Sequence, residues 1–260
     1  MKKYFCIVIL LILSNLIFSQ STILIQGAMN VEVELFVQKM ENPEPISLNG
    51  YDFWKGNLAG KDVLISKTEI GPVNAAISTC IAIERYKPAL IINQGTCGSI
   101  IENLHKKDII IGKSYVDYSG SIAPNLDTGK GSDPLNWTPL FYRIGRTRFD
   151  KIDCDPYFLD QAKNVSYEHG MVVTGVIGSA FQLNKERDRL KWLNETYGMV
   201  CEDMETAVSA MIAKVYGIDF IGIRIVSDNV ITNEPFESRL AVYCNEFVID
   251  LLRILKLPSK

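Results

Sequence analysis

Basic side chains are not gathered into any stretch of this sequence that would suit a nucleic acid. The 260 residues carry 27 Lys and Arg against 30 Asp and Glu, which gives a formal net charge of −3 at neutral pH. Proteins that hold nucleic acid by charge attraction usually show a basic patch or stripe. The sequence therefore predicts no nucleic-acid partner.

Histidine and cysteine are scarce, and their spacing matches neither a zinc site nor a disulfide framework. The chain has two histidines and six cysteines. The cysteines beyond the first twenty residues are odd in number and widely scattered: Cys80, Cys97, Cys154, Cys201 and Cys244. We predict no bound metal, and the sequence leaves open a single disulfide.

No apolar run is long enough to read as a membrane span. The run from residue 4 to 18 follows Met1-Lys2-Lys3 and precedes Ser19-Gln20-Ser21, and it is shorter than the ~20 residues that a spanning helix needs. A basic start, a short apolar core and small or polar residues after it are typical of a secretory signal peptide. We predict a signal peptide at residues 1–20 and an exported mature chain, periplasmic or secreted, that is not stably inserted in a membrane.

The remaining residues 21–260 alternate between strand and helix patterns. Largely apolar stretches indicate buried strands at residues 23–25, 89–93, 108–111, 171–177 and 220–226, the last of which carries one cation, Arg224. Helical patterns are found at residues 30–36, 69–86, 185–193, 207–213 and 236–254, with Asn30 expected at the cap of the first helix. Residues 51–54 and 63–66 are expected to form a hairpin. This alternation predicts one α/β domain with a largely parallel central sheet.

The pattern changes between Tyr118 and Asp155, where Gly, Pro, Asn, Ser and aromatic residues replace periodic structure. A loop of this length inside a compact domain is usually functional or disordered. Trp137, Phe141 and Tyr142 favour a packed lid or an interface over disorder.

Six notable side chains follow the predicted strands. Because ligands in open α/β sheets bind at the carboxyl ends of strands, these residues are candidates for one site: Glu32, Thr96, Phe181, Glu205, Arg224 and Asp228. The small-residue turn at 94–99 would let a ligand approach the backbone, although a plain tight turn is the alternative.

Ordinary structural roles are available for most of these acids and bases. Glu202 and Asp203 suit the first turn of a helix, where acids interact favourably with the helix dipole. Glu205 suits that role less well, because it lies beside residues expected to face the interior, where an unpaired carboxylate is costly. Arg224 needs a partner inside its strand, either a ligand or an acid such as Glu205. Ser227-Asp228 would alternatively cap a following helix.

Five motifs, taken together and in order, resemble the methylthioadenosine/S-adenosylhomocysteine nucleosidases of the nucleoside phosphorylase (uridine phosphorylase) superfamily. They cover nearly the whole mature chain and read Gly27-Ala28-Met29-x-x-Glu32, Ile70-Gly71-x-Val73-Asn74-Ala75-Ala76, Asn93-x-Gly95-Thr96-x-Gly98, Met204-Glu205-x-Ala207 and Arg224-x-x-Ser227-Asp228. The resemblance implies a single three-layer α/β/α domain with a twisted, mixed and largely parallel sheet. It also implies a homodimer, no cofactor, and cleavage of the bond between adenine and ribose by water.

Carried over residue by residue, the resemblance assigns Asp228 to protonation of the purine at N7. Glu32 would orient and deprotonate the attacking water, with Thr96 and Arg224 nearby, and Glu205 would bind the ribose hydroxyls. The other substrate contacts that it implies are Met204 on the sugar, Phe181 stacked on the base, backbone groups of Gly98 and Gln182, and Phe236 in the 5′ pocket.

The sequence departs from the family pattern at a few positions. Asp203 and Thr96 replace the commoner Glu and Ser, and Gln182 replaces an apolar residue. Residues 118–155 do not match at all, and in the family this part shapes the 5′ pocket, partly for the neighbouring subunit. The identity of the 5′ substituent therefore stays open.

Two alternatives to hydrolysis remain at this point. A phosphorylase would need a cationic pocket for phosphate, usually supplied by arginine. Asn93 stands where related purine phosphorylases carry one, and the turn at 27–29 has none either. The second alternative is an exported nucleoside-binding or storage protein on the same fold, which the presence of Glu32, Glu205 and Asp228 argues against.

Overall fold

The computed structural model describes residues 22–258, so the predicted signal peptide lies outside the described residues. A sheet of ten strands forms the centre of the described chain. The strands are β1 (Ile23–Gly27), β2 (Glu41–Leu48), β3 (Tyr51–Leu58), β4 (Lys61–Lys67), β5 (Leu90–Ser99), β6 (Ile109–Asp117), β11 (Ile152–Asp153), β12 (Val172–Ser179), β13 (Met199–Asp203) and β14 (Asp219–Asn229).

The sheet is mixed: most pairs around β1, β5 and β12 are parallel, whereas β14 runs antiparallel to β6 and β13 runs antiparallel to β5. Its order is β11-β6-β12-β13-β5-β1-β4-β3-β2, and β14 pairs with both β5 and β6. β1 runs parallel to β4 and β5, and β14 runs parallel to β5. The carboxyl ends of β1, β5 and β14 consequently meet at one edge of the sheet.

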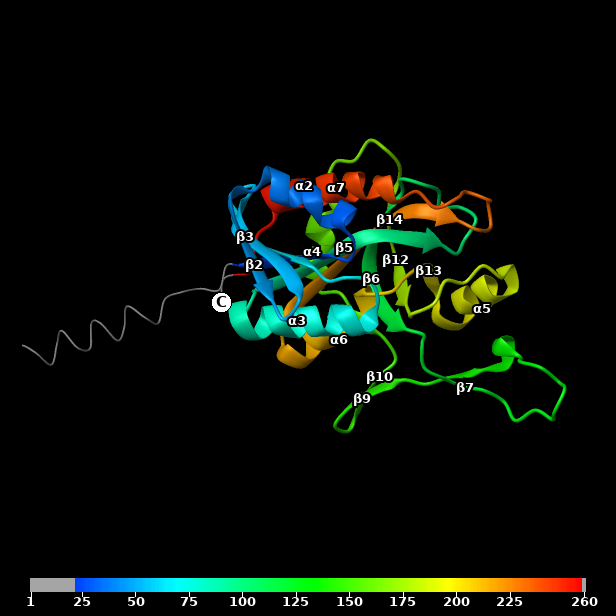
Figure 1. Ribbon diagram of the computed structural model, residues 1–260. Helices are drawn as coiled ribbons and strands as arrows, with labels where there is room; N and C mark the ends of the chain where they lie inside the picture. The colour runs from blue at the N-terminus through cyan, green and yellow to red at the C-terminus, as the bar shows by residue number, and fades with distance from the viewer. Residues whose placement is uncertain (1–21, 259–260) are drawn as a thin grey trace, which may run out of the picture.

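Helices cover both faces of the sheet, which confirms the predicted fold class (Figure 1). α2 (Asn30–Lys39) packs with α7 (Ala241–Ile254) on one face, and α3 (Pro72–Tyr86) packs with α6 (Thr206–Tyr216) on the other. α4 (Pro156–Lys163) contacts β6 and α7, and α5 (Arg187–Tyr197) contacts β13. Within the described range, no helix combines the length and apolar character needed to cross a membrane.

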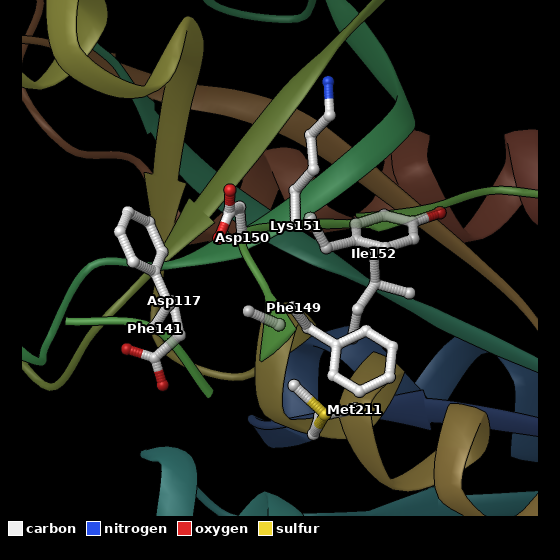
Figure 2. A pocket seen from close by; sticks show the side chains of 9 residues that line it. Asp117, Phe141, Phe149, Asp150, Lys151, Ile152 and Met211 are labelled. Carbon is white, nitrogen blue, oxygen red and sulfur yellow. The ribbon is translucent and has the colours of Figure 1, made fainter. Parts of the chain in front are cut away.

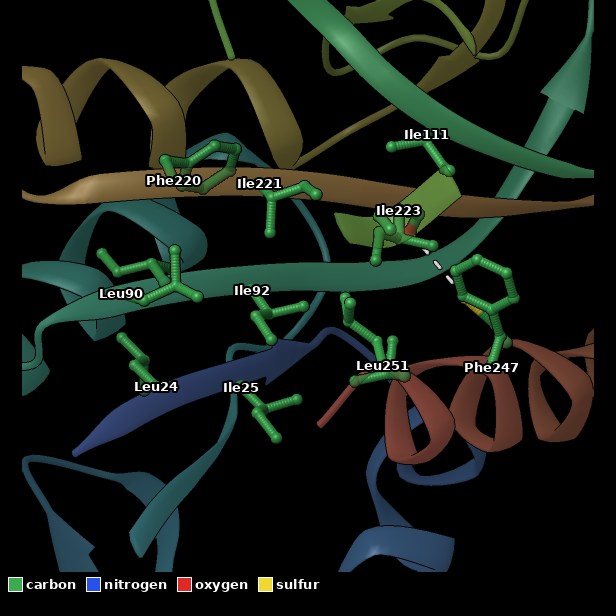
Figure 3. Packing of buried hydrophobic residues seen from close by; sticks show 14 of the residues in the cluster. Leu24, Ile25, Leu90, Ile92, Ile111, Phe220, Ile221, Ile223, Phe247 and Leu251 are labelled. Carbon is green, nitrogen blue, oxygen red and sulfur yellow. Dashed lines mark hydrogen bonds between the residues drawn. The ribbon is translucent and has the colours of Figure 1, made fainter. Parts of the chain in front are cut away.

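The apolar runs of the sequence form the core between these layers. Side chains of β1, β5 and β14 lie beside those of α7 in Figure 3, among them Leu24, Ile25, Leu90, Ile92, Ile221, Ile223, Phe247 and Leu251. All of these side chains are at most 1% exposed. Strands that are covered by helices on both faces need apolar residues at successive positions, which explains the unbroken runs.

Several predicted boundaries were wrong by a few residues. Met29, and not Asn30, is the cap of α2, because the Glu32 carboxylate binds the Met29 N–H at 3.0 Å. α5 begins at Arg187 rather than Lys185, and it ends where Gly198 adopts φ +70°. α7 begins at Ala241 rather than Phe236, because a short 3-10 helix, η2 (Ser238–Leu240), precedes it.

The predicted hairpin is present as β3 and β4, but the edge strand β2 was not predicted. Two prolines and several exposed polar residues make its sequence unlike a strand. Proline is tolerated there because β2 pairs with β3 alone, so one of its sides needs no donors.

Residues 118–155 form an ordered arm rather than an irregular loop. Its elements are β7 (Ser121–Ile122), η1 (Pro134–Asn136), β8 (Thr138–Pro139), β9 (Tyr142–Ile144) and β10 (Thr147–Phe149), followed by β11. β7 pairs with β8, β9 pairs with β10, and β11 joins the main sheet beside β6. The paired strands extend away from the body of the molecule (Figure 1).

The base of the arm packs against the domain beside α6. Phe149 and Ile152 point toward Met211 in Figure 2. The space between the arm and α6 is only about 10 Å³, which is roughly enough for one water molecule. This contact fixes the arm to the domain and offers no room for a ligand.

Candidate active site

A large cavity opens at the carboxyl ends of β1, β5, β13 and β14 and has a volume of about 540 Å³. Pockets of this size hold small molecules of nucleoside or drug dimensions. Eight of the ten predicted site residues line it: Glu32, Thr96, Gly98, Gln182, Met204, Glu205, Asp228 and Phe236. Phe181 and Arg224 are not among the lining residues.

The carboxylate of Glu32 is held at one end of this cavity by four donors. Its Oε2 accepts the backbone N–H groups of Ala28 at 2.8 Å and Met29 at 3.0 Å. Its Oε1 accepts the N–H of Thr96 at 2.8 Å and the Thr96 hydroxyl at 3.1 Å. A Cβ at Gly95, which adopts φ +152°, would come within 2.6 Å of Oε1. Residues 94–99, which the sequence predicted as a turn, continue strand β5, and the glycine at position 95 leaves room for this side chain.

Asp228 lies in β14, two residues beyond its most apolar part. The strand continues to Asn229, so the alternative in which Ser227 and Asp228 cap a helix is wrong. Burial raises the pKa of the Asp228 carboxyl, while the Ser227 hydroxyl, 2.8 Å from its Oδ1, and nearby lysines oppose the rise without cancelling it. A Cβ at Gly98 would stand 3.3 Å from Asp228 Oδ2, so glycine keeps that carboxyl accessible.

Glu205 precedes α6 and is 8% exposed. Its Oε1 accepts the backbone N–H of Gly71 at 2.7 Å. Burial and the neighbouring charge of Asp203 raise the pKa of Glu205 to about 8, against the opposing effects of Arg224 and of the Gly71 N–H. A carboxyl with such a pKa exchanges its proton near neutral pH, and strongly shifted groups of this kind gather at functional sites.

Arg224 lies behind the cavity, and its partner is Asp203 rather than Glu205 or a ligand. Its Nε donates to Asp203 Oδ2 at 2.5 Å, and its Nη2 donates to the side-chain oxygen of Asn93. Arg224 is 2% exposed. Arg224 is not among the residues that line the cavity, and its guanidinium donates to Asp203 and Asn93, so it lies behind the cavity wall rather than in it.

Glu202 and Asp203 belong to β13 and not to the first turn of α6, as the sequence had suggested. Both carboxylates are buried and both line the cavity. Asp203 also accepts the backbone N–H groups of Glu205 and Thr206 at 3.3 Å each. Sequence reasoning missed these roles because a five-residue strand leading directly into a helix shows no periodicity of its own.

Apolar side chains at the cavity mouth are unusually exposed. Phe181 is 68%, Leu183 74%, Phe236 59% and Ile70 50% exposed. The Phe181 ring lies over Gly71, where a Cβ would approach it to 3.0 Å. Grouped exposed apolar residues mark binding surfaces, and three of these four, Ile70, Leu183 and Phe236, line the cavity.

No disulfide joins the cysteines of the described part of the chain. The five cysteines within residues 22–258 are all free thiols, and Cys97, Cys154, Cys201 and Cys244 are buried. The disulfide that the sequence left open is not formed.

The fold and the site together define a small-molecule enzyme of the α/β class, with carboxylates gathered at the carboxyl ends of a mixed sheet. The chain matches the family model described as Phosphorylase superfamily over residues 22–252. It is 30% identical over 221 residues to the 5′-methylthioadenosine/S-adenosylhomocysteine nucleosidase of Shewanella halifaxensis (strain HAW-EB4), an alignment covering 81% of this chain and 87% of the relative. The chain belongs to the phosphorylase superfamily and, within it, to the family of these nucleosidases.

Solved structures share the fold. The nucleosidase of Neisseria meningitidis in complex with methylthio-immucillin-A superposes with a TM-score of 0.75 at 24% identity, covering 90% of this chain and all of that one. The futalosine hydrolase of Helicobacter pylori strain 26695 superposes with a TM-score of 0.73 at 24% identity, covering 91% of this chain and 99% of that one. At this level of identity the likeness establishes the architecture.

Proposed function

We propose that the protein hydrolyses the N-glycosidic bond of an adenine nucleoside of the methylthioadenosine or S-adenosylhomocysteine type and releases adenine. The observation that carries this proposal is the meeting of Glu32, Glu205 and Asp228 in one cavity, although they lie far apart in the sequence. Family membership supports the same reaction, because the relatives bear that activity in their names.

Departure of the base leaves negative charge on the purine, so an acid must supply a proton. Asp228 suits this role because its pKa is raised by burial, and a raised pKa keeps the carboxyl protonated until the base leaves. The proton passes to N7 as the bond between C1′ and N9 breaks. The electron pair of that bond stays with the base.

The attacking water has to lose a proton as its oxygen bonds to C1′. Glu32 is positioned for this step by its four donors, which fix both carboxylate oxygens. A rigidly held base loses little energy to reorganisation when the reaction occurs. The Thr96 hydroxyl donates to Oε1 of the same carboxylate and so limits the positions in which a water molecule can bind Glu32.

Positive charge develops on the ribose in the same step. Glu205 is the buried carboxyl at which ribose hydroxyls would donate charge-assisted hydrogen bonds, and these strengthen as the sugar becomes cationic. Met204 lines the cavity beside it and offers an apolar surface for the sugar ring.

The charges of the cavity favour water over phosphate as nucleophile. Among the lining residues Lys185 is the one cation, and it lies near Asp228 rather than near Glu32. Arg224, the other candidate, is already bound to Asp203 and Asn93. Phosphate recognition usually relies on arginine or on several positive groups, and Glu32 would repel a phosphate at its own end of the cavity.

The test uses the purified chain from residue 21 onward with methylthioadenosine, with and without phosphate, and chromatography of the products. Adenine and free methylthioribose in both reactions support hydrolysis. A sugar phosphate formed only with phosphate would move the protein to the phosphorylases. If calorimetry detects binding of methylthioadenosine but no adenine is released, the second candidate, a nucleoside-binding protein, is favoured. A panel of other 5′-substituted adenine nucleosides then tests whether a different nucleoside is the substrate.

We also propose that the protein works as an exported homodimer. Support for the dimer comes from the family resemblance and from the arm, whose exposed apolar residues include Ile122, Leu126, Leu135 and Leu140. No residue of the arm lines the cavity of its own chain. Light scattering on the purified chain tests the dimer. Cell fractionation, with the mass of the mature chain compared with cleavage near Gln20, tests export.

A further inference from the structure

Residues 180–186, the 180–186 loop, connect β12 to α5 and border the cavity. Gln182, Leu183, Asn184 and Lys185 line it from this side. The loop has no regular secondary structure, and most of its side chains are exposed. A segment of this kind holds a fixed position against a ligand only if specific bonds tie it to the domain.

Those bonds converge on one residue, Asn184. Its backbone N–H donates to Glu202 Oε1 at 3.1 Å, and its side-chain Nδ2 donates to Glu202 Oε2 at 2.6 Å. Nδ2 also donates to the hydroxyl of Tyr118 at 3.1 Å. Among the described residues, every hydrogen bond that joins residues 181–185 to the rest of the chain passes through Asn184.

Glu202 is the centre of the resulting network. Tyr118 donates its hydroxyl to Glu202 Oε2 at 2.7 Å, which closes a ring of three side chains. Glu202 is 7% exposed and Tyr118 is 1% exposed. Burial raises the pKa of the Glu202 carboxyl, and the hydrogen bonds from Asn184 and Tyr118 oppose that rise by favouring the ionised form. Hydrogen bonds to a charged acceptor are stronger than those between neutral groups.

The network also ties the loop to the catalytic end of the cavity. Glu202 in β13 and Asp228 in β14 both pair in register with Gly98 of β5. Strands in a sheet lie about 4.8 Å apart, so the residue that holds the loop and the proposed acid lie two strand spacings from one another. A loop fixed to Glu202 is therefore fixed relative to Asp228.

We propose that Glu202 is a positioning residue that acts through Asn184, with Tyr118, to set the 180–186 loop against the purine base. The inference rests on the proposed function, because it takes the base to bind between this loop and Asp228. Glu202 lines the cavity, but Asn184 and Tyr118 donate to both of its carboxylate oxygens, so the role assigned to it is exerted through the loop. Its contribution is to substrate binding, since the loop bonds are present in the empty site and persist throughout the reaction.

The experiment compares Glu202→Gln with wild type in hydrolysis of methylthioadenosine. In Glu202→Gln the new side-chain N–H₂ group faces a donor of Asn184, so the loop loses one of its hydrogen bonds to β13. Loss of a charged hydrogen bond of this kind predicts a rise in KM of about tenfold with kcat within about threefold. Glu186→Gln, the same change at an exposed residue of the loop, is the matched control and should leave both constants unchanged. Asn184→Ala should raise KM similarly, and the double variant should be no worse than either single one.

Each result has one meaning. Absence of wild-type turnover defeats the proposed function and is seen before any variant is made. With an active wild type, an unchanged KM in Glu202→Gln, additive effects in the double variant, or a loss confined to kcat would each overturn the positioning role. If Glu202→Gln fails to fold, Tyr118→Phe removes one donor to Glu202 and should raise KM by roughly threefold with kcat preserved. An unchanged KM in that variant would also overturn the role.

Discussion

Arg224 and Asp203 form a buried ion pair directly behind the cavity. Their Nε and Oδ2 atoms are 2.5 Å apart, and both side chains are 2% exposed. Asp203 reaches in the other direction to the backbone N–H groups that begin α6, next to Glu205. Asp203 therefore links the buried Arg224 guanidinium to the backbone of Glu205, the residue whose carboxyl we assign to ribose binding.

The first prediction concerns the stability that this pair provides. Asp203→Asn leaves the Arg224 guanidinium buried beside a neutral group, and breaking a buried pair from one side typically costs about 3–5 kcal/mol of unfolding free energy. Urea denaturation measures the loss. Asp160→Asn, at a pair with Lys163 in which Asp160 is 71% exposed, is the control and should cost less than about 1 kcal/mol. Equal losses in the two variants would contradict the assigned importance of the buried pair.

The second prediction concerns the acid. Asp228→Asn has nearly the same shape but no proton to give, so adenine release should fall by at least about 10²–10⁴-fold, as is usual for loss of a general acid. Circular dichroism and the melting temperature should stay close to those of wild type. Wild-type turnover in a folded Asp228→Asn protein would refute the assignment.

The third prediction concerns the base. Glu32→Gln removes the proton acceptor for water, and kcat should fall by about 10²–10⁴-fold. Thr96→Val keeps the backbone donor to Glu32 and removes only the hydroxyl, so its loss should be nearer tenfold. Glu34→Gln, at an exposed position on the same helix, should have wild-type activity. If Thr96→Val were as inactive as Glu32→Gln, the hydroxyl rather than the carboxylate would be the essential group.

The fourth prediction follows from the pKa of about 8 at Glu205. In the unfolded chain this carboxyl has its ordinary pKa of 4.5, so between these values only the folded protein holds the proton. Stability of the empty protein should therefore be greatest below pH 4.5 on account of this group and should decline until about pH 8. In Glu205→Gln this decline disappears. Urea midpoints measured in parallel at several pH values give the comparison, and parallel curves would disprove the shift.

Substrate binding gives a fifth prediction from the same carboxyl. Ribose hydroxyls that donate to Glu205 favour its ionised form, so binding at pH 7 should release close to one proton per site. Calorimetry in two buffers of different ionisation enthalpy counts that proton. Glu205→Gln should release none. Equal proton release by the variant and wild type would place the titrating group elsewhere.

Much of the architecture was predictable because the sheet is covered on both faces. Residues 23–25 and 89–92 are unbroken apolar runs, and 220–226 is apolar apart from Arg224 and Gly222, so burial between helices is their stable environment. The edge strand β2 was not predictable, because most of its residues are exposed and polar and its two prolines are unusual in a strand. The arm at 118–155 was recognised as a departure, but its short strands carry too few residues for a periodic signal.

The candidate site divides in the same way. Positions at the ends of strands were found from the sequence because parallel strands bring their carboxyl ends to one edge of the sheet, and this does not depend on which hydrogen bonds the side chains then form. Glu32, Thr96, Glu205 and Asp228 were identified in this manner, whereas Gly98 was named only through the family resemblance. The partners of these side chains could not be predicted from the sequence. Arg224 pairs with Asp203 rather than Glu205, and Glu202 holds the 180–186 loop through Asn184.

The sequence by itself determined the class of fold, the order of its elements and the set of polar residues brought to one edge of the sheet. These depend on hydrophobic pattern and chain direction, which are properties of short segments. The tertiary structure alone decided which carboxylate meets which donor, and so which pKa is raised and which charge is neutralised. Those outcomes depend on distances of a few ångströms between residues that are tens to hundreds of positions apart, and no local pattern encodes them.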